Sequence, residues 1–225
     1  MNKLTYLGHS AFLLETQNFS ALFDPFLVSS PVKAKDFKNL DAIFVTHGHG
    51  DHFGDTLQIA QNTGATVYTS LELASWLSKK GVHAIGMQFG VAKFDFGTLR
   101  MTSAKHSNSF SVESGIPCGE SCGFVLSIDN KKIYHAGDTS LIADMMLLES
   151  ERIDVACLPI GGYYTMDVND AVRAVSFIKP VIAVPMHYNT FAQITQAPNE
   201  FVKLVKDANL DTEVKVLNFG ESFTF

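Results

Sequence analysis

Three histidines and an aspartate fall within six consecutive residues, directly after the apolar run 42–45: His47, His49, Asp51 and His52. If these side chains crowd at the end of a strand, burial disfavours charged imidazoles and leaves polar groups in need of partners. One divalent cation would satisfy all of them. We expect Gly48 and Gly50 to let the backbone bend, so that neighbouring side chains converge. The alternative is a solvated histidine-rich turn.

Three more residues of the same types follow apolar runs later in the chain: His106, Asp138 and His187. A single residue of this kind at a strand end is more often structural, but together with the first four they form a ligand set. Imidazole and carboxylate suit zinc, and they also suit manganese or iron. Seven ligands divide into two sets of three and one shared carboxylate.

Other residues with chemical potential have simpler interpretations. His9 lies at the first turn, where a structural role and a place in a site are both open, and Asp24 precedes Pro25, where we expect it to accept hydrogen bonds from loop backbone. His83 is expected at the surface. Cys118 and Cys122 are interpreted as small apolar or loop residues, with a redox pair or a soft metal site as the alternative.

Composition limits the function classes. The 225 residues are 46% hydrophobic and 18% charged, which favours a substantial core and one domain over residues 1–225. Acidic residues outnumber basic ones by 23 to 17, and no basic run exists, so nucleic acid or an anionic membrane is disfavoured as a partner. Three cysteines and the lack of a long apolar segment favour a cytoplasmic protein. A homo-oligomer is compatible with the sequence.

Short apolar runs and turn signals predict the elements that position these residues. The first fifty residues read as a β-meander with strands over 3–7, 11–15, 21–23 and 42–45. We then expect a helix from 56, a strand over 66–68, a helix over 71–80, a strand near 83–85 and a hairpin over 91–102 that turns at Gly97-Thr98.

The second half repeats this architecture. Paired strands over 121–128 and 132–136 precede alternating helical and extended segments over 141–149, 155–159, 167–177, 181–185, 200–208 and 214–219. This pattern predicts an α/β (α+β) fold with two mixed sheets packed together and helices outside. The polar segment 103–123 is expected to be a functional loop.

The ligand pattern His-x-His-x-Asp-His, followed by a lone His, a Gly-Asp-Thr and a final His, resembles the metallo-β-lactamase superfamily. Finer motifs resemble its branch of uncharacterised metal-dependent hydrolases related to the ascorbate 6-phosphate lactonase: residues 8–12, 23–26, 135–139, 161–166 and 185–188. The resemblance implies a four-layer αββα sandwich whose two sheets pack face to face.

The resemblance also implies a role for each site residue. It places His47, His49 and His106 on one metal, Asp51, His52 and His187 on a second, and Asp138 between them. It makes His9 and His135 candidates for lining the site. Flavodiiron relatives carry Glu at the second ligand position, so His49 favours hydrolysis over oxygen reduction. Ribonuclease Z relatives carry a basic exosite that this chain lacks.

These features predict a dinuclear hydrolase that uses a metal-bridging hydroxide on a small ester, lactone or phosphodiester. Asp51 would orient the hydroxide, and His135, His9 or a metal-bound water would protonate the leaving group. We expect the loop 107–120 and Tyr163-Tyr164 to select the substrate, although the tyrosines could instead pack beside Gly161-Gly162. The alternatives are a nuclease or phosphodiesterase acting on RNA or DNA and a non-catalytic metal-binding protein.

Overall fold

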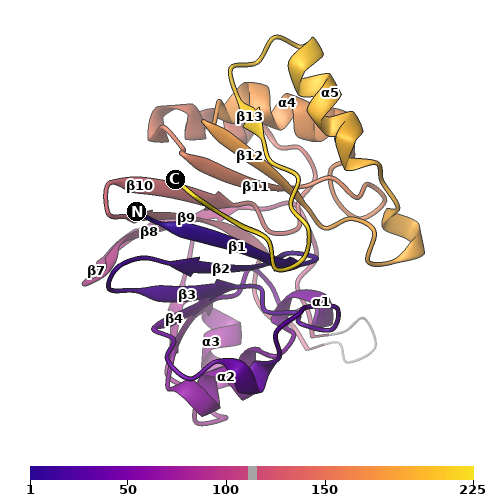
Figure 1. Cartoon of the computed structure of the whole chain (residues 1–225). Coiled ribbons are helices and arrows are strands. Elements are labelled where there is room, and N and C mark those ends of the chain that lie inside the picture. The colour runs from indigo at the N-terminus through magenta and orange to yellow at the C-terminus, as the bar shows by residue number, and fades with distance from the viewer. Residues whose placement is uncertain (111–115) are drawn as a thin grey trace. The chain divides into compact units, whose positions relative to one another are not determined.

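The computed structural model describes residues 1–110 and 116–225, which form two compact units (Figure 1). Unit 1 combines Met1–Gly90, Ser107–Ser121 and Asn218–Phe225. Unit 2 combines Val91–His106 and Cys122–Leu217. Each unit is built on a seven-stranded mixed sheet.

The sheet of unit 1 is antiparallel in one half and parallel in the other. Its strands, in spatial order, are β14 (Ser222–Thr224), β1 (Lys3–Gly8), β2 (Ala11–Glu15), β3 (Ser20–Phe23), β4 (Ala42–Phe44), β5 (Thr66–Ser70) and β6 (Ala84–Met87). Pairing is antiparallel from β14 to β3 and parallel from β3 to β6. The expected meander therefore stops at β3. As a result, β1, β3 and β4 all run in the same direction.

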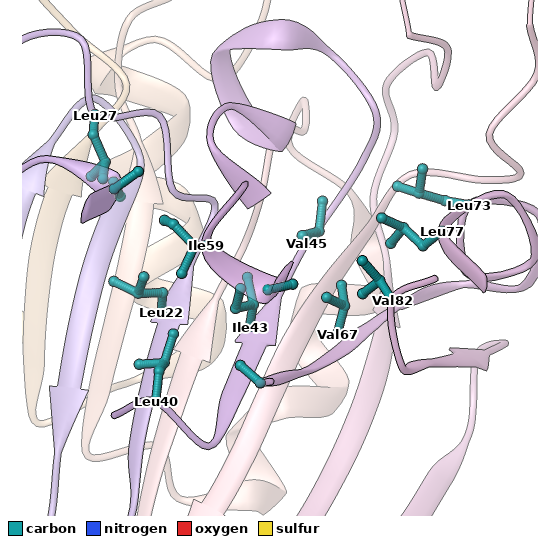
Figure 2. Packing of buried hydrophobic residues seen from close by; sticks show 14 of the residues in the cluster. Leu22, Leu27, Leu40, Ile43, Val45, Ile59, Val67, Leu73, Leu77 and Val82 are labelled. Atoms are coloured by element: carbon teal, nitrogen blue, oxygen red, sulfur yellow. The ribbon is translucent and has the colours of Figure 1, made fainter. Parts of the chain in front are cut away.

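Helices and one buried cluster support the parallel half of this sheet. They are η1 (Ala34–Asp36), α1 (Gly50–Phe53), α2 (Thr56–Thr63) and α3 (Leu71–Ser78). The helix α2 packs on β5, and α3 packs on β5 and β6. Leu22, Ile43 and Val67 point from successive strands toward Ile59 of α2 and Leu77 of α3 (Figure 2), and all five are completely buried. This apolar packing anchors β4 immediately before the histidine-rich stretch.

The sheet of unit 2 has the same design. Its strands, in spatial order, are β13 (Glu213–Val214), β12 (Ile182–Met186), β11 (Val155–Pro159), β10 (Lys131–His135), β9 (Cys122–Ile128), β8 (Gly97–Ser103) and β7 (Val91–Phe94). Pairing is antiparallel from β7 to β10 and parallel from β10 to β13. Consequently β8, β10 and β12 run in the same direction.

Four helical segments complete unit 2 among the described residues: η2 (Ala143–Glu151), α4 (Val168–Ile178), η3 (Ala192–Ile194) and α5 (Pro198–Asp207). The helix α4 packs against η2 and α5. Asp167 caps α4, because its side chain accepts a hydrogen bond of 2.8 Å from the Asp170 N–H. No helix in the described part of the chain is long and apolar enough to cross a membrane.

The predicted α/β class with two mixed sheets is confirmed, and five α-helices lie in the described residues. Several details were wrong. The hairpin of unit 2 turns at 95–96 because Phe94 pairs with Gly97, and only Val214 of the predicted extended run 214–219 lies in a strand, β13. The helical segment predicted over 141–149 is present as the 3₁₀ helix η2 over 143–151. The terminal strand β14 was not predicted. Face-to-face packing of the sheets and a single domain over 1–225 stay predictions.

Candidate metal site

The direction of the strands explains why chemical groups gather in unit 1. His9 directly follows β1, Asp24 directly follows β3, and the stretch 46–52 begins two residues after β4. Because these three strands are parallel to one another, their carboxyl ends lie at the same edge of the sheet. Functional groups in α/β sheets characteristically collect at this edge.

His47 and His49 bring two ring nitrogens together. His47 Nε2 lies 3.1 Å from His49 Nδ1. Nitrogens at this distance share either a proton or a cation. Two ligands of one zinc ion, each about 2.0–2.1 Å from it, lie about 3–3.4 Å apart, so this spacing fits a metal.

Asp51, His52 and His9 form a second group in the same unit. Asp51 and His52 lie on α1, and their ligand atoms and that of His9 all lie within 4.8 Å of one another. His9 Nε2 is 3.2 Å from Asp51 Oδ2, and Tyr6 Oη donates a hydrogen bond of 2.9 Å to the carbonyl oxygen of His9. The structure thus places His9, which the sequence left open, beside two predicted metal ligands.

A buried carboxylate, Asp24, sets the tautomers of His52 and His47. Asp24 Oδ2 accepts hydrogen bonds of 2.7 Å from His52 Nδ1 and 2.7 Å from Thr46 Oγ1, while Oδ1 accepts one of 2.8 Å from Thr46 N. Since the Thr46 hydroxyl gives its only proton to Asp24, it must accept from His47 Nδ1, which lies 3.0 Å away. Both rings therefore carry their proton on Nδ1, and Nε2 is the nitrogen with which each can bind a metal.

The expectation that Asp24 accepts from loop backbone is confirmed by its bond to Thr46 N, but its contact with His52 was missed. The signal was present in the sequence. Asp24 follows a strand in the same way as the predicted ligands do, and a carboxylate behind a ligating histidine is a recurrent arrangement.

Unit 2 brings its three predicted ligands together by the same rule. His106, Asp138 and His187 follow β8, β10 and β12, whose carboxyl ends share one edge of the sheet. Asp138 Oδ2 lies 3.0 Å from His187 Nε2 and 3.5 Å from His106 Nε2. One carboxylate oxygen thus faces two imidazoles at distances close to those between ligands of one metal.

Unusual backbone conformations coincide with these groups. His9, Asp24 and His187 have positive φ angles of 53°, 39° and 56°. Non-glycine residues adopt this conformation at a cost of about 1–3 kcal/mol, which the surrounding structure must offset. Such strain at three strand ends is typical of functional sites.

Gly48 is required by a close approach and not by backbone freedom. Neither Gly48 nor Gly50 has a positive φ, so the predicted reason for these glycines is wrong. A Cβ on Gly48 would lie 2.7 Å from Cys118 Sγ, whereas one on Gly50 would meet nothing within 4 Å. Asn108 Oδ1 also accepts a hydrogen bond of 2.8 Å from Gly48 N, which fixes the described part of the loop 107–120 on the histidine stretch.

The remaining predicted residues lie as follows. His135 is buried at the end of β10, and its Nδ1 accepts a hydrogen bond of 3.3 Å from Gly137 N. Tyr163 and Tyr164 are 81% and 50% exposed, with ring centroids 4.6 Å apart, so neither is buried, and the choice between substrate contact and packing beside Gly161-Gly162 stays a prediction. Residues 111–115 of the predicted substrate loop lie outside the described residues.

The cysteines and His83 lie in environments that favour structural roles. All three cysteines are buried and none forms a disulfide, and burial raises the pKa of the Cys118 thiol to about 11. A thiol that stays protonated at neutral pH is a poor nucleophile and a poor soft-metal ligand. His83 is at the surface as predicted, with Nδ1 3.0 Å from Thr66 Oγ1.

Comparison with known proteins assigns the family. Residues 3–187 match the family described as beta-lactamase superfamily domain, which spans most of the chain. The chain belongs to this superfamily. A member from Alkaliphilus metalliredigens, named UPF0173 metal-dependent hydrolase, is 47% identical over 228 residues, which cover 99% of this chain and 100% of that protein.

A further relative and two solved structures are similar to this chain. A protein of the same name from Archaeoglobus fulgidus is 44% identical over 230 residues, covering 99% of each chain. The solved structure of Igni18 from Ignicoccus hospitalis, described as a novel metallo hydrolase, has a TM-score of 0.90 and 38% identity, covering 100% of this chain and 99% of that one. An isothiocyanate hydrolase from Delia radicum gut bacteria shares the fold with a TM-score of 0.78 at 21% identity, covering 99% and 98% of the two chains.

These findings confirm the predicted class: the protein is a metal-dependent hydrolase of metallo-β-lactamase fold. Its histidine and aspartate clusters are candidates for binding the metal. The individual ligand assignments and the catalytic roles of Asp51, His9 and His135 stay predictions. The relation to the ascorbate 6-phosphate lactonase also stays a prediction.

Proposed function

We propose that the protein is a dinuclear hydrolase that cleaves a small ester, lactone or phosphodiester. In this proposal the metal ligands are the seven residues identified from the sequence, namely His47, His49, Asp51, His52, His106, Asp138 and His187. Zinc is the proposed metal, because these histidine nitrogens and aspartate oxygens are the donors it prefers. Manganese and iron accept the same donors.

The observation that carries this proposal is the spacing of donor atoms inside each unit. In unit 1, His47 Nε2 and His49 Nδ1 lie 3.1 Å apart. In unit 2, Asp138 Oδ2 lies 3.0 Å from His187 Nε2. Both distances fit two ligands of one ion, at about 3–3.4 Å. The hydrogen bonds of Asp24 and Thr46 also hold His47 and His52 in the tautomer that metal binding needs.

A pair of divalent ions, when bound, would acidify a water molecule to a pKa near 7 and polarise the oxygen of the scissile group. The protein residues have complementary tasks. Asp24 keeps two imidazoles oriented, and His9 holds the Asp51 carboxylate through a contact of 3.2 Å. The contact of His9 with Asp51, a predicted metal ligand, supports His9 as a proposed proton donor.

The charge of the chain supports a small substrate. With 23 acidic and 17 basic residues and no basic run, a polyanionic nucleic acid would lack the cationic groups that usually dominate its affinity. The exposed Tyr163 and Tyr164 provide aromatic faces in the loop after β11, and we propose that they contact the substrate.

The proposal is tested by metal content and hydrolysis measured on the same samples. Purified protein loaded with zinc or manganese is analysed by elemental mass spectrometry and assayed on a chromogenic phosphodiester, an ester and a lactone panel. We expect two ions per chain and turnover of at least one substrate. His49→Ala and Asp138→Ala should each lower the metal content and abolish turnover.

Two matched variants serve as controls. His83→Ala removes an exposed histidine, and Asp129→Asn changes a turn aspartate between β9 and β10, so both should keep metal content and turnover. Two bound metals without hydrolysis of any substrate would favour a non-catalytic metal protein. Salt-dependent binding and cleavage of single-stranded RNA or DNA would favour a nuclease. Unchanged turnover in both alanine variants would refute the proposed ligand set.

A further inference from the structure

The Thr139 side chain connects two loops of unit 2 that carry predicted metal ligands. Thr139 directly follows Asp138, and its hydroxyl accepts a hydrogen bond of 2.9 Å from Lys105 N, the residue before His106. The same hydroxyl donates a hydrogen bond of 2.7 Å to Ser140 O. Ser140 N in turn donates one of 3.3 Å to Lys105 O, so the two loops are joined on both sides of the hydroxyl.

The main chain of Thr139 reaches a third loop. Met166 N donates a hydrogen bond of 2.9 Å to Thr139 O, and Gly162 N donates one of 2.9 Å to Met166 O. This loop follows β11 and passes directly beside the third ligand, since a Cβ on Gly161 would overlap with His187 O. Only glycine permits such an approach to main-chain atoms.

Thr139 therefore joins the segments that carry His106 and Asp138 to each other and to the loop that passes beside His187. Its side chain is completely buried, although its partners, Lys105 and Ser140, are exposed residues. Loss of the hydroxyl removes the acceptor of the Lys105 N–H, and a backbone donor left without its acceptor is destabilising. Without this acceptor the Lys105 main chain would shift, and His106, the next residue, would shift with it.

We propose that the Thr139 hydroxyl is a positioning group that sets His106 against Asp138 for metal binding. The inference rests on the part of the proposed function that makes these two residues metal ligands. His106 Nε2 and Asp138 Oδ2 are 3.5 Å apart. The Thr139 hydroxyl maintains this distance because it binds the main chain of Lys105, the residue before His106. Partners of this kind typically change metal affinity by about 10–100-fold when they are lost.

The test compares Thr139→Val, which replaces the hydroxyl by a methyl group of similar size, with Thr139→Ser, which keeps the hydroxyl. Zinc affinity of the full chain is measured by competition with a chromophoric chelator. We expect Thr139→Val to bind zinc at least about tenfold more weakly. Thr139→Ser should stay close to the wild type.

A matched control separates positioning from general loss of stability. The Thr63 hydroxyl likewise donates to a carbonyl oxygen, Ile59 O at 2.8 Å, and accepts from an amide, Ala65 N at 3.2 Å, but it lies at the end of α2. Thr63→Val should therefore leave zinc affinity unchanged.

Amide hydrogen exchange of the metal-free protein gives a second readout. Thr139→Val should speed exchange of the Lys105 amide, whose acceptor is the hydroxyl. It should spare the Met166 amide, whose acceptor is the main-chain carbonyl. Wild-type zinc affinity in Thr139→Val would overturn the inference, as would an equal loss in Thr139→Ser or in Thr63→Val.

The outcome also separates this inference from the hydrolytic proposal. A protein that binds zinc through Thr139-dependent ligands but cleaves no substrate would keep the positioning role and refute the hydrolytic reaction. If the wild-type protein hydrolyses a substrate of the panel but Thr139→Val keeps its zinc affinity, the hydrolytic proposal stands and the positioning role of Thr139 is refuted. A wild-type protein that binds no metal would overturn both.

Discussion

Asparagine at position 24 should weaken metal binding although it differs from aspartate by one atom. Asp24 is completely buried and accepts three hydrogen bonds, from His52 Nδ1, Thr46 Oγ1 and Thr46 N, at 2.7, 2.7 and 2.8 Å. A carboxylate can accept all three, but a carboxamide has only one accepting oxygen. Either orientation of the new amide sets two donors against each other.

The two orientations have different consequences. With the amide nitrogen in the place of Oδ1, two donors face each other, the new amide and the Thr46 N–H. The free energy of unfolding then falls by about 1–3 kcal/mol. With the nitrogen in the place of Oδ2, the His52 ring must move its proton to Nε2, which then cannot bind a metal. The Thr46 hydroxyl must also turn, so His47 loses its acceptor. A 10–100-fold loss of metal affinity, or about 1.4–2.7 kcal/mol, is expected.

The assay is chelator competition for zinc on Asp24→Asn, paired with urea unfolding of the metal-free protein. Asp41→Asn is the control, because Asp41 Oδ2 also accepts from an amide and a hydroxyl, those of Ser20 at 2.7 and 3.2 Å, but contacts no imidazole. It should leave zinc affinity unchanged. Reduced stability of Asp24→Asn with wild-type zinc affinity would show that Asp24 only holds the loop, and would refute the argument from tautomers.

Four further outcomes are expected. Because burial raises the pKa of Cys118 to about 11, its labelling by iodoacetamide at pH 8 should be slow until the chain unfolds, and a rate typical of an exposed thiol would contradict this. Gly48→Ala should cost about 1–3 kcal/mol through its clash with Cys118, and less in a Cys118→Ala background; equal costs measured by urea unfolding would exclude the clash. Hydrogen bonding to Lys132 lowers the pKa of Glu151 from 4.5, so this pair stabilises the fold above that pH and loses its effect as pH falls through the folded value; Lys132→Met should destabilise at pH 7 but not at pH 2. Leu22→Ala should cost about 2–5 kcal/mol in the same assay, and a loss below 1 kcal/mol would contradict a rigid core there.

The sequence alone determined the chemistry and most of the elements. His47, His49, Asp51 and His52 are adjacent in the chain, so their shared role could be read from spacing. The strands β2 and β11 were predicted with their observed bounds, because alternating or continuous apolar runs encode burial locally. His106, Asp138 and His187 could be selected because each follows such a run.

Only the tertiary structure decided what orients these groups. Strand direction depends on pairing between distant segments, and the parallel course of β8, β10 and β12 is what brings three separated ligands to one edge of the sheet. The same holds for β1, β3 and β4, which place His9 beside Asp51 and Asp24 behind His52. Nothing in the local sequence shows that Thr139 accepts from Lys105, because a hydrogen bond across 34 residues exists only after the strands between them have paired. Gly48 makes the same point: its need for glycine comes from Cys118, 70 residues later, and not from its own backbone.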